Sequence, residues 1–404
     1  MATNNNNKAL NVPHLRFPEF SGEWNKCTIN DLATVVGGGT PDTTVKSYWG
    51  GDIQWFTPSE IGKNKYVDFS LRTITRDGLD NSSAKLLPLH TILLSSRATV
   101  GECSIASNEC TTNQGFQSLI AKQCNIDFLY YLIQTKKKDL IRNACGSTFL
   151  EISANEIRMI KVAVPVQNEQ EQIAKLLSLI DERIATQNKI IEKYESLIQA
   201  MCDTLIERET QQVALSFSDF GQSYSGLSGK NAEDFGDGYP FITYMNVYQN
   251  QIIDSTDVGL VKIKETEQQS VVHYGDILFT LSSETPEEVG MGAVYLGETY
   301  PLYLNSFCFG IHITDEAKIY SPFLAYYVSS QSFRKAVYPL AQGSTRFNLQ
   351  KSDFMKKKFS FPMIEKQRKI YSILNTYSDK LIVEKQIIGL LCSQKRYLLR
   401  QLFI

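Results

Sequence analysis

The chain repeats itself with an offset of 197 residues, and this duplication constrains its fold more than any other sequence feature. The tripeptide Gly-Ser-Thr occurs at 146–148 and again at 343–345. The neighbouring segments that correspond at or near this offset are Pro165 and Pro362, 169–181 and 366–378, 128–134 and 323–329, and 90–106 and 275–296. A chance tripeptide would not have matching neighbours over such a length. The sequence therefore predicts two copies of one structural unit.

Each copy ends in a stretch of roughly 40 residues whose apolar side chains recur at alternating spacings of three and four. This spacing places one apolar seam along an α-helix and requires a partner helix with a similar seam. Neither stretch contains proline, and each follows one, as helix starts often do. The predicted seam residues are Ile173, Leu177, Ile180, Ile184, Ile191 and Ile198 in the first stretch and Ile370, Leu374, Leu381, Ile388, Leu391 and Leu398 in the second.

The two stretches carry opposite net charge. Residues 167–210 contain nine acidic and five basic residues, whereas residues 365–404 contain three acidic and eight basic ones. Unlike charges favour pairing of the two helices over self-association of either one. The first helix leaves the first domain and the second begins where the second domain ends, so we expect an antiparallel coiled coil with pseudo-two-fold symmetry. The alternative is two separate surface helices, each packed on its own domain.

The fold class that follows is α+β, with two similar mixed α/β domains separated by the two long helices. Short strand-like runs such as 91–95 (TILLS) and 309–313 (FGIHI) alternate with segments rich in Gly, Asn, Ser and Thr. Each domain is expected to close with one helix, at 128–143 or 321–337. The predicted boundaries are 1–19 for a flexible N-terminal lead, 20–165 for domain 1, 166–210 for the first helix, 211–363 for domain 2 and 364–404 for the second helix.

Composition and cysteine spacing exclude several classes of protein. A net charge of −2 argues against a uniformly basic nucleic-acid binder but not against a local basic face. No apolar run approaches the roughly 18 residues of a membrane span, and the N-terminus lacks the apolar core of a signal peptide. We therefore expect a cytoplasmic protein with reduced thiols. The eight cysteines form no C-x-x-C pair and the four histidines are scattered singly, so no metal site is predicted.

Known catalytic motifs are missing from the sequence. It contains no Walker A loop, no G-x-G-x-x-G and no Asn/Asp-Pro-Pro-Tyr motif, so we expect that the chain is not an enzyme. Two similar domains at a fixed separation suit duplex DNA, whose half-sites are spaced by helical turns. Because the two copies have diverged, the expected target is bipartite and asymmetric, with an unread spacer.

These residues resemble a known family, the specificity (S) subunits of type I restriction-modification systems. The resemblance covers nearly the whole chain. It rests on 12–24 (VPHLRFPEFSGEW), 37–41 (GGGTP), 95–101 (SSRATVG), 113–121 (NQGFQSLIA) and 146–181, followed by a weaker second copy. In that copy 282–290 (SSETPEEVG) carries three acidic residues where the first copy has Arg97, which argues against an equivalent phosphate contact there.

The resemblance implies a non-catalytic subunit, acting in defence against foreign DNA, whose two target recognition domains read double-stranded DNA. The partners it implies are two methyltransferase (M) subunits and restriction (R) subunits, with no membrane. This chain is expected to bind no cofactor, whereas S-adenosylmethionine, ATP and Mg²⁺ are expected on the partner subunits. Two alternatives remain open: a two-headed protein–protein scaffold that reads no DNA, and an enzyme with unrecognised motifs.

Polar loops supply the candidate DNA contacts. Base edges require side chains that donate and accept in fixed geometry, and phosphates require cations or backbone N–H groups. Arg97 is the strongest single candidate, whereas Trp49 and Trp55 are expected in the core. The alternative for each loop is an ordinary surface turn. The predicted DNA-binding residues are Thr40, Thr43, Thr57, Ser95, Arg97, Thr99, Asn113 and Gln114 in domain 1, and Ser223, Ser225, Lys230, Thr243, Tyr244, Asn246, Ser282, Ser283, Asn305 and Arg346 in domain 2.

Overall fold

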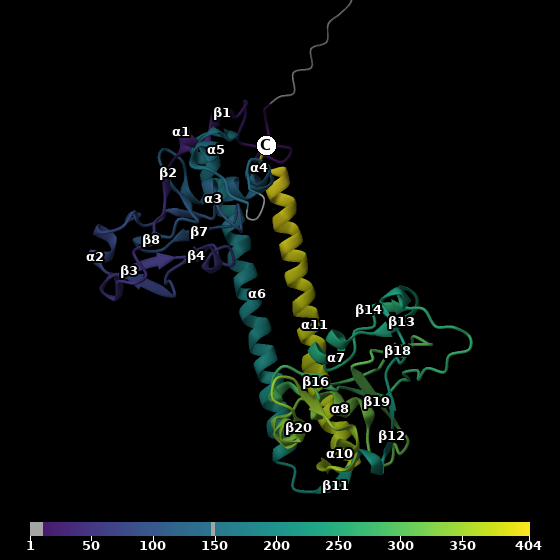
Figure 1. Ribbon diagram of the computed structural model, residues 1–404. Helices are drawn as coiled ribbons and strands as arrows, with labels where there is room; N and C mark the ends of the chain where they lie inside the picture. Colours follow the sequence, from purple (N-terminus) through teal and green to yellow (C-terminus); the bar gives the residue numbers. More distant parts are fainter. Residues whose placement is uncertain (1–10, 147–149) are drawn as a thin grey trace, which may run out of the picture. The chain divides into compact units, whose positions relative to one another are not determined.

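The structure is a computed structural model that describes residues 11–146 and 150–404 (Figure 1). It contains two compact units: unit 1 comprises Met1–Asn188 and Gln386–Ile404, and unit 2 comprises Lys189–Lys385. Residues 1–10 of the predicted N-terminal lead, and Ser147 and Thr148 of the first Gly-Ser-Thr segment, lie outside the described residues.

Unit 1 is built from short strands and helices around its own core. Its elements are β1 (Asn25–Thr28), α1 (Ile29–Leu32), β2 (Ala33–Gly37), β3 (Trp49–Phe56), β4 (Tyr66–Val67), β5 (Arg72–Ile74), α2 (Arg76–Asp80), β6 (Ile92–Leu94), β7 (Cys103–Ala106), β8 (Cys110–Thr112), β9 (Gln117–Ala121), α3 (Ile126–Thr135), α4 (Lys137–Arg142), α5 (Ala154–Met159) and β10 (Lys161–Val164). The strands form three sheets, ordered β2-β9-β6-β7-β4, β5-β3-β8 and β1-β10.

Unit 2 has a closely similar set of elements. They are β11 (Gln212–Ser216), β12 (Gly221–Ser225), β13 (Phe235–Ile242), α7 (Tyr244–Gln249), β14 (Val258–Val261), β15 (Ile277–Thr280), β16 (Ser282–Ser283), β17 (Gly292–Val294), β18 (Tyr303–Leu304), β19 (Cys308–Ile313), α8 (Ser321–Tyr327), α9 (Gln331–Val337), β20 (Ala341–Gln342), β21 (Phe347–Leu349), α10 (Lys351–Lys356) and β22 (Lys358–Pro362). The sheets are ordered β12-β19-β15-β17, β14-β13-β18, β16-β21-β20 and β11-β22.

The two units repeat one strand plan. The order β2-β9-β6-β7 of unit 1 corresponds to β12-β19-β15-β17 of unit 2. In the smaller sheets, β3 and β13 each pair antiparallel with one neighbour, with a register shift, and parallel with the other. Such detailed agreement of pairing direction and irregularity confirms the duplication and the mixed α and β fold predicted from the sequence.

A long helix follows β10 and another follows β22, as the apolar spacing predicts. They are α6 (Gln167–Glu207) and α11 (Ile364–Gln401), and each unit contains part of both. None of the helices within the described ranges is both long enough and apolar enough to cross a bilayer. Within each unit the two helix segments lie side by side (Figure 1).

The predicted seam residues lie on the packed faces of these helix segments. Ile173, Leu177, Ile180 and Leu398 belong to the core of unit 1, and Ile198, Ile370 and Leu374 belong to the core of unit 2. Leu391 is also buried, whereas Ile184, Ile191, Leu381 and Ile388 are half-buried. No predicted seam position is exposed.

Ion pairs between α6 and α11 agree with the opposite charges of the two stretches. The pairs between the helices are Asp181–Lys395 (2.6 Å) within unit 1 and Glu195–Lys385 (2.7 Å) within unit 2. Glu209, two residues after the end of α6, pairs with Lys366 on α11 (3.3 Å) within unit 2. In unit 2 the partner on α11 falls from Lys385 to Lys366 as the residue number rises from Glu195 on α6 to Glu209 just after it. The two helices therefore run antiparallel there.

A buried glutamine begins each long helix with the same hydrogen bonds. Gln170 donates to the Pro165 carbonyl oxygen (3.0 Å) and accepts from the backbone N–H just before α3 (3.0 Å). Gln367 donates to the Pro362 carbonyl oxygen (2.8 Å) and accepts from the N–H just before α8 (2.9 Å). Each amide thus satisfies backbone groups at a helix end, where they lack partners within the helix. These hydrogen bonds fix the position of the first turn of each long helix.

The N-terminal segment is fastened to the start of α6. Arg16 donates from Nε and Nη2 to the two carboxylate oxygens of Glu169, at 2.8 and 2.7 Å. The Trp24 indole donates to the same carboxylate at 3.3 Å. Glu169 is completely buried, so Arg16 compensates a charge that water cannot reach.

The prediction of one closing helix per domain is wrong. Unit 1 has α3 and α4 instead, separated at Lys136, whose ψ of 6° leaves the helical region. Unit 2 has α8 and α9, and the Ser330 hydroxyl caps α9 by accepting from the Phe333 N–H at 3.3 Å. A serine side chain that competes for backbone N–H groups favours a new helix start at such a position.

Candidate nucleic-acid interface

The polar loops that the sequence analysis selects in unit 1 meet at one turn, residues 112–116, which we call hub 1. Backbone hydrogen bonds join it to the loops at 37–44, 54–60 and 95–101. They run from Gly39 N to the Thr112 oxygen (2.8 Å), from Asn113 N to the Phe56 oxygen (3.0 Å) and from Ser96 N to the Gly115 oxygen (2.8 Å). The fold therefore brings together four loops that the sequence places up to about 75 residues apart.

Unit 2 repeats this arrangement at residues 304–308, which we call hub 2. Its bonds to the neighbouring loops run from Leu227 N to the Leu304 oxygen (2.8 Å), from Asn305 N to the Ile242 oxygen (3.0 Å) and from Leu281 N to the Phe307 oxygen (2.8 Å). These bonds correspond one by one to those of hub 1. One backbone framework thus carries the candidate residues of both units.

An asparagine shapes each hub. The Asn113 amide oxygen accepts from the Gly115 N–H at 2.8 Å, and the Asn305 amide oxygen accepts from the Phe307 N–H at 2.9 Å. Asparagine side chains stabilise tight turns in this way. Both residues are predicted DNA contacts, and both are half-buried with their amide oxygens engaged by the turn. Positioning of the loops is therefore one role that the structure gives them.

A glycine lies against each hub because nothing larger fits. A Cβ built on Gly38 would come within 3.0 Å of the Asn113 carbonyl oxygen, and one on Gly226 would come equally close to the Asn305 carbonyl oxygen. Real Cβ atoms essentially never approach backbone so closely. Glycine is the residue that permits such close approach of two backbone segments.

Arg97 lies beside hub 1 on the 95–101 loop and is about half exposed. Its Nε lies 3.7 Å from a carboxylate oxygen of Glu151, which is also half exposed. An ion pair this open to solvent is weak, so Arg97 can exchange its partner for a phosphate or a base edge. The next residue, Ala98, has a φ of 63°, an uncommon conformation for a residue with a side chain.

The other candidates of unit 1 are bonded mostly to one another or to their own loops. Thr40 donates to the Gln114 amide oxygen, which links two of the loops. The Thr57 hydroxyl donates to Glu60 at 2.6 Å. The buried Ser95 hydroxyl lies 2.9 Å from that of Thr99.

In unit 2 the candidates divide into exposed residues and loop anchors. Arg346 is exposed, with its guanidinium carbon 5.7 Å from the exposed Phe307 ring. Tyr244 donates to the Ser282 carbonyl oxygen at 2.7 Å, and burial raises the pKa of its phenol, which keeps it a donor. The Lys230 ammonium is nearly buried and pairs with Glu267.

The surroundings of Asn246 differ from those expected for a DNA contact. It is completely buried, and its amide donates to the carbonyl oxygens of Asp254 (2.8 Å) and Asp257 (2.6 Å). These bonds hold the loop after α7. A direct base contact would require the side chain to abandon them, so the structure gives Asn246 a structural role instead.

Solvent exposure divides the whole predicted set. Exposed residues are Thr43, Arg97, Thr99, Gln114, Ser225 and Arg346; half-buried residues are Thr40, Thr57, Asn113, Ser223, Lys230, Thr243, Tyr244 and Asn305; buried residues are Ser95, Asn246, Ser282 and Ser283. The exposed group includes both arginines, and these are the side chains best placed to meet a ligand. Contacts by individual residues stay predictions.

Arg72 is a candidate that sequence reasoning missed. Its guanidinium carbon lies 3.6 Å from the Trp49 ring centroid, and Trp49 packs edge-on against the buried Trp55 at 5.0 Å. Arg72 is exposed on β5, which pairs with β3. Only that strand pairing reveals the stack, because Arg72 lies 17 or more residues from either tryptophan.

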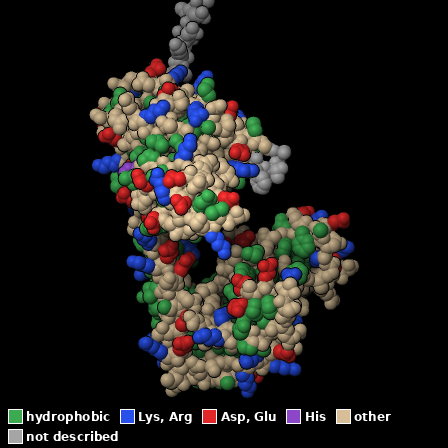
Figure 2. All heavy atoms as spheres, turned by 60° about the vertical axis from the view of Figure 1, so that its left-hand side comes forward, with side chains coloured by type: hydrophobic (Ala, Val, Ile, Leu, Met, Phe, Trp, Pro, Cys, Tyr) green, Lys and Arg blue, Asp and Glu red, His purple; other side chains and the backbone are tan. Residues whose placement is uncertain are grey.

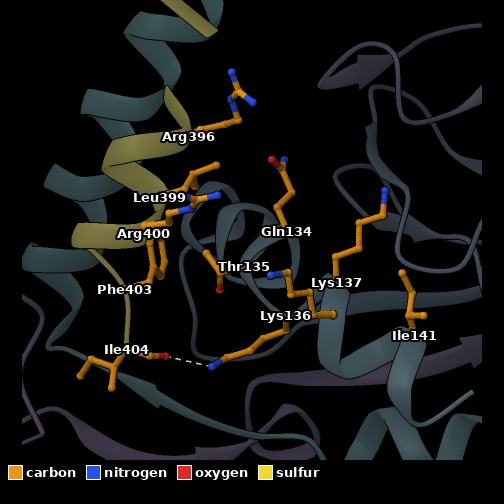
Figure 3. Close-up of a pocket in the computed structure, with 11 residues that line it drawn as sticks. Gln134, Thr135, Lys136, Lys137, Ile141, Arg396, Leu399, Arg400, Phe403 and Ile404 are labelled. Atoms are coloured by element: carbon orange, nitrogen blue, oxygen red, sulfur yellow. Dashed lines mark hydrogen bonds between the residues drawn. The ribbon is translucent and has the colours of Figure 1, made fainter. Parts of the chain in front are cut away.

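A basic hollow of about 530 Å³ opens in unit 1 between α3, α4 and the end of α11 (Figure 3). Arg396, Arg400 and Lys136 line it, together with apolar Leu399 and Phe403. Lys136 donates to the Ile404 carbonyl oxygen at 2.9 Å, shown as a dashed line. Positive charge concentrated in this way attracts anions such as phosphates.

Away from such local clusters the surface charge is mixed. On the face drawn in Figure 2, Lys and Arg side chains are interspersed with Asp and Glu over both units. This agrees with the net charge of −2. Affinity for an anionic polymer would therefore depend on local contacts rather than on a field of one sign.

Comparison with known proteins places these features in context. Residues 21–196 and 219–391 match the family model described as the type I restriction modification DNA specificity domain. The specificity subunit of the type I restriction enzyme MjaIX from Methanocaldococcus jannaschii is 40% identical over 182 residues, which is 42% of this chain and 41% of that protein. The EcoR124I/EcoR124II specificity subunit of Escherichia coli is 29% identical over 175 residues, 41% of this chain and 43% of that protein. These matches span about two fifths of the length of the curated relatives.

Solved structures share the fold. The crystal structure of a type I restriction-modification S subunit from M. genitalium has a TM-score of 0.54 and 18% identity, covering 97% of this chain and 99% of that one. A chain from a study of complex assembly and conformational transition of the type I restriction-modification system has a TM-score of 0.59 and 13% identity, covering 93% and 96%. At such identities the likeness concerns architecture.

Proposed function

Since the chain belongs to the family of type I restriction-modification DNA specificity proteins, we propose that it is the sequence-specific DNA-binding subunit of such a system. It reads a bipartite, asymmetric target, with one half recognised by the loops of each unit. It is not an enzyme itself. It directs the methylation of adenine and, on unmodified DNA, ATP-driven cleavage by its partner subunits.

The observation that carries this proposal is the repeated hub. Hubs 1 and 2 have the same backbone bonds, which position loops in the same way in both units. The exposed side chains differ, with Arg97 and Gln114 near hub 1 and Arg346 near hub 2. Equal frameworks with different polar side chains suit two half-sites of different sequence. The helices α6 and α11 would set the spacer between them.

Partner subunits need a surface on this chain, and α11 offers one. Ile382, Val383, Leu390 and Tyr397 are each more than half exposed on this helix. Apolar side chains exposed in such number on one element suit protein contacts. The partners proposed are two M subunits, which would hold S-adenosylmethionine, and R subunits, which would hold ATP and Mg²⁺. The complex would act in the cytoplasm, without a membrane.

Exchange of one domain tests the proposal. Residues 211–363 would be replaced by the corresponding segment of a relative with another target, and the protein produced with its M subunit for mapping of methylated adenines. We expect one half of the target to change and the other half to stay. A change in both halves would contradict independent reading, and an absence of sequence-dependent binding would favour a protein–protein scaffold. Methylation by this chain without the M subunit would favour an enzyme.

Spacer length gives a second readout. Inserting two residues into α6 near Asn188 should alter the unread spacer or abolish assembly, because it changes both the length and the phase of the helix. The control is the same insertion after Glu265, an exposed turn residue of unit 2. An unchanged spacer in the α6 variant would show that the helices do not set it.

A further inference from the structure

Two histidines and an aspartate that are separate in the sequence converge in unit 2. His312 lies on β19, Asp276 immediately precedes β15, and His273 lies in the turn before it. Their potential ligand atoms all lie within 4.8 Å of one another. Sequence spacing hides this group because His312 follows Asp276 by 36 residues, and the pairing of β15 with β19 brings them together.

The buried carboxylate is held rigidly. Asp276 accepts from the His312 Nδ1 at 2.8 Å, from the Tyr224 hydroxyl at 2.7 Å and from the backbone N–H of His273 at 2.9 Å. Burial first, and then the charge of Asp276, raise the pKa of Tyr224, so its hydroxyl remains a donor. The Tyr224 ring also stacks on the His312 ring with centroids 4.2 Å apart. The position of His312 is therefore fixed on two sides.

The second imidazole closes the group on its solvent side. The rings of His273 and His312 are 4.9 Å apart at their centroids. His273 is exposed, whereas Asp276 is buried and His312 is half-buried. The group thus combines two ligands held in place by the fold with one exposed ligand that can turn towards a bound ion.

We propose that His273, Asp276 and His312 form a binding site for a divalent late transition-metal ion, of which Zn²⁺ is the best fit. Imidazole and carboxylate are ligands that Zn²⁺, Co²⁺ and Ni²⁺ accept, and a site with three protein ligands keeps a position for water. Ligands about 2.0–2.2 Å from a tetrahedral ion are about 3.3 Å apart, so the group has to contract slightly. Rotation of the exposed His273 side chain accomplishes this. On binding, the His312 Nδ1 would exchange its hydrogen bond to Asp276 for the ion. The Tyr224 hydroxyl and the His273 backbone N–H would continue to hold the carboxylate, as groups around metal ligands usually do.

A bound ion would tie the 273–276 turn to β19 and, through Tyr224, to β12. The predicted DNA contacts Ser223 and Ser225 flank Tyr224 on that strand. Metal binding would therefore stabilise unit 2 at the strand that supports one of its loops. The inference stands on this geometry and does not depend on DNA reading.

Metal titration tests the site. The full-length protein, with exposed Cys145 and Cys392 replaced by serine to remove competing thiols, would be titrated with Co²⁺ and then Zn²⁺ in buffer without chelators. We expect one equivalent of Co²⁺ to give visible d–d absorption that Zn²⁺ abolishes. Zn²⁺ should also raise the melting temperature in proportion to the logarithm of its concentration.

Single-histidine variants decide the outcome. His273→Ala removes an exposed ligand and should weaken Zn²⁺ affinity about tenfold or more, whereas the matched control His14→Ala, an exposed histidine of unit 1, should leave it unchanged. His312→Ala should abolish the cobalt absorption, with circular dichroism confirming that the variant folds. Equal Zn²⁺ affinity of the wild-type protein and His273→Ala would overturn the proposal, as would an equal loss in His14→Ala.

Discussion

Replacing the glycine at hub 1 by alanine should impair one half of DNA recognition. In Gly38→Ala the new Cβ would come within 3.0 Å of the Asn113 carbonyl oxygen, and a backbone atom cannot swing away as a flexible side chain can. The hub or the 37–44 loop must therefore shift. Overpacking of this kind costs about 1–3 kcal/mol of unfolding free energy.

The effect on recognition follows from the same displacement. The shift moves the loops that carry Thr40 and Gln114, and a well-formed contact to a base edge is worth about 1–3 kcal/mol of discrimination. Loss of one such contact corresponds to about a 5- to 160-fold loss of affinity for the target. Because the hubs are separate, Gly38→Ala should relax one half of the target and Gly226→Ala the other.

Binding assays against a panel of single-base target variants, together with melting curves, measure both effects. The matched control is Gly389→Ala on α11, where a Cβ meets no atom within 4 Å and helix propensity favours alanine by about 1 kcal/mol. That variant should bind DNA as the wild-type protein does. The reasoning is refuted if Gly38→Ala melts normally and keeps full discrimination in both halves.

Three further predictions concern stability. Arg16→Ala leaves the buried Glu169 carboxylate without its ion pair and should lower the unfolding free energy by about 3–5 kcal/mol, or the melting temperature by roughly 6–20 °C. The control Arg76→Ala breaks an exposed ion pair and should cost at most about 1 kcal/mol. Equal losses in the two variants would contradict the buried ion pair. Leu177→Ala should lower the unfolding free energy measured in urea by about 2–5 kcal/mol because the side chain is fully buried. The control Leu179→Ala removes a half-exposed side chain nearby and should change the unfolding free energy little. Similar losses in both variants would mean that the seam is not packed. Burial raises the pKa of five thiols from 9.0 to about 12. The folded protein therefore keeps protons that the unfolded chain releases above about pH 9. The unfolding free energy should fall as pH rises from about 9 towards 12. A urea midpoint that is unchanged between about pH 8 and pH 10 would argue against this burial. The five thiols are Cys103, Cys110, Cys124, Cys202 and Cys308.

The long helices were predictable because their signal is local and periodic. Each helical turn needs an apolar residue on the same face, so the spacing of Ile173, Leu177 and Ile180 is sufficient to locate the packed face. The break at Lys136 was not predictable in the same way. No proline or glycine marks it within 128–143, and the interruption depends on one residue leaving the helical region.

The composition of the candidate site was only partly accessible from sequence. Turn-forming residues marked the loops, since Gly, Asn and Thr favour such segments wherever they occur. Their roles within the loops depend on contacts between distant segments. Asn246 and Arg97 are both predicted DNA contacts, yet Asn246 is buried and bonded to two backbone carbonyls whereas Arg97 is half exposed. The group around Asp276 had no sequence signal, because strand pairing alone assembles it.

The two units share one hub side chain, and they differ at a neighbouring loop position. Asn113 and Asn305 are identical and make the same turn, because the backbone groups they satisfy are the same in both units. The exposed Arg97 occupies the strand position that the buried Ser282 occupies in unit 2, since Glu151 and Asn348 are their partners at the 197-residue offset. The hub asparagine cannot change without removing the side-chain acceptor of its turn, whereas the other four positions of 112–116 and 304–308 differ between the units. New specificity can therefore arise by substitution around the unchanged asparagine, and each unit can acquire it independently of the other.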